Sequence, residues 1–76
     1  MNINNSVLDE AGNYIAGFIR LRREELQMTQ QELADKCGIG VRTVIRLESG
    51  KFWLNVKQLV VILYHLNSKI TLSAKN

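Results

Sequence analysis

Two arginines one helical turn apart, Arg42 and Arg46, have the chemistry needed to read a nucleic acid. A guanidinium group can donate two parallel hydrogen bonds to O6 and N7 of a guanine, a pattern that no other base presents. Val41 is apolar and short enough to touch a thymine methyl group. We therefore expect Val41, Arg42 and Arg46 to read bases, provided that a helix presents them on its outer face.

Residues 29–51 predict a pair of short helices, the second of which carries these side chains. Thr29 and Glu32 have the spacing of a capping box, in which a hydroxyl and a carboxylate each accept a backbone N–H, so a helix should start there. Gly38 stands where a left-handed residue would end that helix. A second helix should span 41–49, which gives the order of a helix-turn-helix. Its expected inward stripe is Val44, Ile45, Leu47 and Glu48.

Polar groups around this pair are placed to contact DNA phosphates, which fix the register of a protein on the duplex without reading its sequence. The net charge of +3 is only mildly basic, so the distribution of charge matters more than the total. A basic surface around the second helix is the pattern expected of a DNA-binding protein, and a solvated charged face is the alternative. The expected phosphate contacts are Gln31, the backbone amides at Gly40, Thr43 and Lys51.

The composition gives almost no support for an enzyme. The 76 residues include one Cys and one His. We find no Ser–His–Asp set, no Cys–His pair at close spacing, no paired carboxylates and no glycine-rich phosphate loop. We expect no catalytic residues, no metal site and no cofactor. The polar start does not resemble a signal peptide, and no apolar run approaches the roughly 20 residues of a membrane span, which predicts a cytoplasmic protein.

Further helices should flank the helix pair on both sides. Residues 1–12 are polar and rich in Asn, and we expect a flexible arm there. Asn13 is the expected N-cap of the first helix, and Gly17 inside that helix predicts a close helix contact. Asn55 should cap a fourth helix, which completes a domain of residues 13–67.

Within the tail, residues 68–76, the stretch 69–73 has the period-two alternation of a β-strand. A single chain offers this strand no other strand to pair with. We therefore expect it to pair with the same strand of a second copy through Ile70, Thr71 and Leu72, which would make the protein a homodimer. A disordered tail is the alternative. A partner would also stabilise a chain this short, which buries only about 60% of its unfolded surface.

The sequence resembles the Cro/C1-type (XRE-family) helix-turn-helix domain of bacterial and phage repressors over about residues 15–67. The resemblance implies an all-α fold of four helices, followed here by the short C-terminal β-strand. Two positions depart from the family: Leu54 stands where Pro is frequent, and Arg22 where the residue is usually apolar. The residues that carry the match are Thr29-Gln30-Gln31-Glu32-Leu33-Ala34, Gly38, Thr43-Val44, Arg46-Leu47-Glu48 and Gly50-Lys51.

This resemblance implies roles for three further residues. Gln30 matches a glutamine that approaches the phosphate backbone or an outer base. Glu48 matches a glutamate that forms a structural ion pair with an arginine of the first helix, which is Arg23 here. The implied function is a sequence-specific transcriptional regulator, most simply a repressor that binds an inverted-repeat operator in double-stranded DNA as a homodimer.

A narrower resemblance, carried by residues 70–76 after the fourth helix, is to the HipB-type antitoxins. Their C-terminal strands pair across a dimer, and their operons encode a toxin kinase, so a toxin protein is a further implied partner. Phe52 and Trp53, in the loop before the fourth helix, are candidate partner-binding residues, although a loop Trp more often covers its own core. The alternative function is thus a protein-binding antitoxin or a phage-type regulator whose main partner is another protein.

Overall fold

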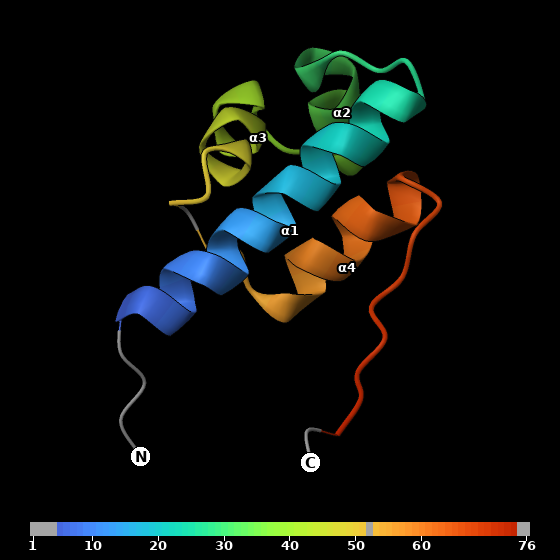
Figure 1. Ribbon diagram of the computed structural model, residues 1–76. Helices are drawn as coiled ribbons and strands as arrows, with labels where there is room; N and C mark the ends of the chain where they lie inside the picture. Colours follow the sequence, from blue (N-terminus) through green and yellow to red (C-terminus); the bar gives the residue numbers. More distant parts are fainter. Residues whose placement is uncertain (1–4, 52, 75–76) are drawn as a thin grey trace.

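The computed structural model describes residues 5–51 and 53–74, which contain four helices and no strand (Figure 1). Helix α1 is long, and α2 and α3 follow it as a pair of short helices on one side. Helix α4 packs against α2 and is seen beside α1 in Figure 1. The bounds are Asn5–Glu25 for α1, Gln30–Cys37 for α2, Val41–Glu48 for α3 and Val56–His65 for α4.

The core consists of aliphatic side chains from all four helices. Ile19 of α1, Leu33 of α2 and Val44 of α3 have no exposed surface. Burial of each such side chain contributes about 1.5–3 kcal/mol to folding, so the core fixes which face of α3 points inward. The buried set is Ala16, Ile19, Leu33, Ala34, Val44, Leu47, Ile62, Leu63 and Leu66.

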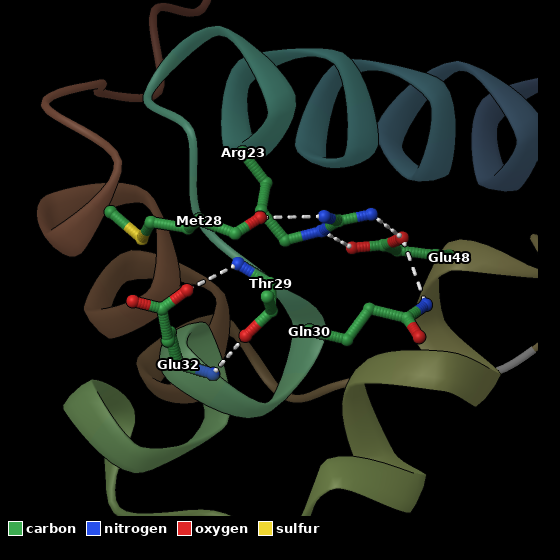
Figure 2. Close-up of polar contacts among 6 residues, drawn as sticks. All are labelled: Arg23, Met28, Thr29, Gln30, Glu32 and Glu48. Carbon is green, nitrogen blue, oxygen red and sulfur yellow. Dashed lines mark hydrogen bonds and ion pairs between the residues drawn. The ribbon is translucent and has the colours of Figure 1, made fainter.

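Local capping confirms the expected limits of α2 and the start of α4. The Oγ1 of Thr29 accepts a hydrogen bond from the backbone N–H of Glu32 at 3.0 Å, and Oε1 of Glu32 accepts one from the backbone N–H of Thr29 at 2.9 Å (Figure 2). Gly38 ends α2 in the left-handed conformation, with φ 68°. Asn55 caps α4, and its Oδ1 accepts the N–H of Gln58 at 2.8 Å.

The expected start of the first helix at Asn13 was wrong, because α1 begins at Asn5 and residues 5–12 of the expected arm are helical. Gly12 is buried inside the helix, where an added Cβ would lie 2.8 Å from the carbonyl oxygen of Gly50. The close approach expected at Gly17 is therefore found at Gly12, whereas an added Cβ at Gly17 would meet nothing within 4 Å. Residues 1–4 lie outside the described part of the chain.

The strand expected in the tail is not formed by the single chain. Residues 68–74 have no regular secondary structure, because an isolated strand leaves its N–H and C=O groups without partners. Ile70 is exposed, and 90% of the surface of Leu72 is exposed. The chain turns after α4, and the tail descends at the right of the view in Figure 1.

The two departures from the family pattern have structural explanations. The Nε of Arg22 donates a hydrogen bond of 2.9 Å to the carbonyl oxygen of Leu66, which lies at the C-terminal end of α4. Helix ends leave such carbonyls without helical partners, so Arg22 joins α1 to α4 by satisfying one of them. Leu54, where Pro is frequent in the family, is half-buried and packs against the core.

Candidate nucleic-acid interface

Helix α3 presents Arg42 and Arg46 on its outer face. Both side chains are exposed, whereas Val44 and Leu47 on the opposite face are buried. Because residues four apart lie one above the other on a helix, the two guanidinium groups share one side of α3. This arrangement suits the reading of neighbouring bases in a major groove.

A buried ion pair fixes the C-terminal end of α3 against α1. The Nε of Arg23 lies 2.7 Å from Oε2 of Glu48, and Nη2 of Arg23 lies 3.0 Å from Oε1 (Figure 2). The two side chains are only 11% and 4% exposed. The hydrogen bond to Glu48 raises the pKa of Arg23 above its ordinary value, although burial opposes the shift. The structure thus brings together the two residues that the family resemblance pairs.

The same network reaches the start of α2. The Nη1 of Arg23 donates to the carbonyl oxygen of Met28 at 2.8 Å, and Nε2 of Gln30 donates to Oε1 of Glu48 at 3.2 Å (Figure 2). An amide has a second N–H and a carbonyl oxygen, so Gln30 retains groups with which to contact DNA. The Glu48 carboxylate is therefore held by residues of α1 and α2 and is nearly buried.

The residues expected to contact phosphates differ in their surroundings. Gln31 and Lys51 are exposed, and Nε2 of Gln31 donates to Oδ1 of Asp35 on the same helix at 2.8 Å. Thr43 is half-buried. Gly40 is the N-cap of α3 in an extended conformation with no side-chain cap. The N-terminal amides of α3 therefore lie where a phosphate oxygen suits them.

Ile45 was placed wrongly, because it belongs to the outer face of α3 rather than to the inward stripe. Its side chain is 46% exposed. Conversely Val41, expected to face outward, is half-buried and packs partly against the core. Successive helical residues are turned by about 100°, so Ile45 cannot share the direction of Val44 in an 8-residue helix that buries only one face. The exposed Ile45 is a second apolar group suited to a thymine methyl.

The candidate partner-binding and dimer residues that the structure describes are exposed, and Trp53 lies close to Leu47 of α3. Trp53 is exposed, with 52% of its surface accessible, and Phe52 lies outside the described residues. Ile70, Thr71 and Leu72 are all exposed on the tail. Within residues 5–51 and 53–74 no three His, Cys, Asp or Glu side chains are close enough to hold a metal ion. In the same part of the chain no helix has the length and apolar character to cross a membrane.

Two short helices that are joined by a tight turn and each bury one face, with arginines on the outer face of the second, have the arrangement of a helix-turn-helix protein. A family model described as "Helix-turn-helix" matches residues 19–72. The chain belongs to the Cro/C1-type (XRE) helix-turn-helix family.

Two relatives agree with this assignment. An uncharacterized HTH-type transcriptional regulator, y4mF, of Sinorhizobium fredii is 32% identical over 60 residues, which cover 79% of each chain. An uncharacterized HTH-type transcriptional regulator of Methanothermobacter thermautotrophicus is 47% identical over 35 residues, which cover 46% of this chain and 51% of the relative.

Proposed function

We propose that this protein is a sequence-specific DNA-binding transcriptional regulator that acts as a repressor. The observation that carries the proposal is the pair of exposed guanidinium groups of Arg42 and Arg46 on the outer face of α3. The opposite face of α3 is buried, and Glu48 at its end is bound to Arg23. Helix α3 is thus held in place before DNA binds, which reduces the entropic cost of ordering its outer face on binding.

The regulator acts as a homodimer on an inverted repeat. One α3 helix spans only a few base pairs, and two copies on successive major grooves, about 34 Å apart, double the number of bases read. The tail supports dimerisation, because Ile70 and Leu72 expose apolar surface on a segment whose backbone is free of helix and sheet. Pairing of two tails would bury both side chains and satisfy the backbone groups between them.

Base reading is assigned to Arg42, Arg46 and Val41. Phosphate contacts that set the register are assigned to Lys51, to the α3 amides from Gly40 onward, and to the side chains of Gln30, Gln31 and Thr43. A dimer bound in this way covers its operator, so repression follows from occlusion of the same DNA.

The test is selection of bound duplexes from a random pool by the full wild-type chain. We expect an inverted repeat whose half-sites are one helical turn apart, with guanines in each half. Binding to that site should weaken with salt, with a slope of about −0.9 for each neutralised phosphate. Enrichment of no sequence, or of a single unrepeated site, would contradict the proposal.

A second function is that of an antitoxin that also represses its own operon. The exposed Trp53 favours it, because large exposed aromatic side chains anchor many protein interfaces. The test is co-expression with the product of the adjacent gene. Trp53→Ala should weaken a complex between the two proteins without changing affinity for the selected DNA. An adjacent gene product that binds both forms equally well would remove Trp53 from this role.

A further inference from the structure

Helix α1 has a second apolar face that the domain itself does not use. Ala11, Tyr14, Phe18 and Leu21 follow one another at steps of three, four and three residues, and all four are exposed. We call these four residues the outer seam. Tyr14 is 76% exposed and Leu21 is 60% exposed. Such surface on a helix that is already anchored in the core has no function within the single chain.

The outer seam lies opposite the face by which α1 joins the domain. Gly12, Ala16, Ile19 and Arg23 are buried, and at about 100° per residue they lie on the far side of the helix from Tyr14 and Leu21. Arg23 is the residue that holds α3. A partner on the outer seam therefore leaves the DNA-reading face of α3 uncovered.

The spacing of the seam indicates that its occupant is a helix. Alternating steps of three and four residues repeat every seven, which is the pattern by which two helices pack knobs into holes. Val7, four residues before Ala11, continues the same spacing. Aromatic side chains such as Tyr14 and Phe18 are frequent anchors of protein interfaces.

The charge beside the seam gives the chemistry of that helix. Glu10, Gly17 and Glu24 follow one another at steps of seven along one edge of the seam, and both glutamates are exposed. Gly17 has open space around it, so a neighbouring helix can approach closely there. We propose that the outer seam binds an amphipathic helix of a different protein, with Lys or Arg side chains on the edge that meets Glu10 and Glu24.

A second copy of this chain is a poor occupant. In an antiparallel pair of seams, Tyr14 would pack beside Phe18 of the other copy, and Glu10 would then face Glu24 of that copy. In a parallel pair, the Glu25 residues of the two copies would meet in the seam. Like charges in these positions destabilise helix pairs, whereas a basic edge would be attracted.

The test uses two synthetic helical peptides of the length of α1, 21 residues, with leucine at alternating three- and four-residue steps. One peptide carries Lys beside the leucines and the other carries Glu. Fluorescence anisotropy with the full chain should show that the Lys peptide binds at least about ten times more tightly, since opposite charges favour and like charges oppose pairing. Leu21→Lys should abolish binding of the Lys peptide. Tyr64→Lys, which changes an exposed aromatic residue of α4, should not.

The second measurement repeats the binding experiment with the double variant Glu10→Lys and Glu24→Lys, which reverses the charge of the edge and leaves the four residues of the outer seam unchanged. We expect this variant to prefer the Glu peptide. Equal binding of both peptides, loss of binding in Tyr64→Lys alone, or an unchanged preference after charge reversal would each overturn the proposal. A fall in the solution mass of Leu21→Lys relative to wild type would also overturn it, because a second copy would then cover the seam.

Discussion

The ion pair between Arg23 and Glu48 is the residue-scale feature that connects three helices. It is nearly excluded from water, and Glu48 also accepts from Gln30 while Arg23 also donates to the Met28 carbonyl. Removal of one member of a buried pair leaves the other charge without a partner, which costs more than the pair itself contributes. The contribution of the pair can therefore be tested by measuring the stability of a variant that lacks one of the two residues.

Glu48→Ala should lower the free energy of unfolding by about 3–5 kcal/mol, as expected for breaking a buried pair. Glu25→Ala is the matched control. Glu25 also lies near an arginine, with its Oε1 3.4 Å from Nη1 of Arg22, but this pair is exposed. Its loss should cost less than about 1 kcal/mol. Urea denaturation of both variants measures the difference, and equal effects would show that burial of the Arg23–Glu48 pair has no energetic consequence.

The capping box gives a pH dependence at the residue scale. Hydrogen bonds from the backbone and side chain of Thr29 lower the pKa of Glu32. A lowered folded-state pKa contributes stability that is present above the unfolded value of about 4.3 and is lost as the pH falls through the folded value. The stability advantage of wild type over Glu32→Gln should therefore be constant near neutral pH and shrink below about pH 4. Thermal melts of both proteins between neutral and acid pH measure it, and an advantage that grows in acid would contradict this sign.

At the scale of elements, two glycines within α1 provide a matched pair. A methyl group at Gly12 would press against the backbone oxygen of Gly50, in the loop that follows α3, whereas a methyl group at Gly17 would meet open space. Gly50 is itself closely surrounded, because a Cβ added to it would meet the side chain of Asn13. The first half of α1 therefore sets the position of that loop.

Gly12→Ala should destabilise the protein by about 1–3 kcal/mol through overpacking. Gly17→Ala should stabilise it by about 0.5–1 kcal/mol, because alanine is the better helix former. Denaturant titration of the two variants gives both values. Stabilisation by Gly12→Ala would mean that α1 and the loop are not in contact in solution.

The limits of the helices show which structural features can be predicted from the sequence. Thr29, Gly38 and Asn55 were predictive because each acts on backbone groups within a few residues. The start of α1 was not predictable in this way. Asn13 is a residue type that often caps a helix, but α1 begins at Asn5, and its Gly12 lies against a loop 38 positions later in the chain. Ile45 was misplaced because an apolar residue beside an inward stripe is compatible with either face of a short helix.

At the scale of the whole molecule, the surface of the chain is larger than that of a typical folded monomer. The accessible area is 6017 Å², against roughly 4,700 Å² expected for a monomer of this mass. The exposed tail and the outer seam both belong to this surface. The alternation of apolar and polar residues predicted a strand at Lys69–Ser73. A strand also needs a second strand to pair with, and the described part of one chain does not supply it.

Deletion of residues 69–76 should convert a dimer into a monomer, because it removes the segment assigned to pairing. Sedimentation equilibrium of the truncated and full-length chains measures their masses. The helical domain should keep its far-ultraviolet spectrum, since Ile70 and Leu72 are exposed and no core residue is removed. A truncated chain that is still a dimer would move the interface to another surface.

The most direct test of the central claim compares the base preferences of arginine variants. Arg42→Ala and Arg46→Ala should each select duplexes that have lost the preference for guanine at one position of each half-site, a discrimination of about 1–3 kcal/mol. Lys36→Ala is the control, because it also removes one exposed positive charge but lines a surface beside Tyr64 and Asn67, away from α3. It should select the wild-type sequence. If both arginine variants select that same sequence with unchanged preferences, α3 does not read DNA through these residues.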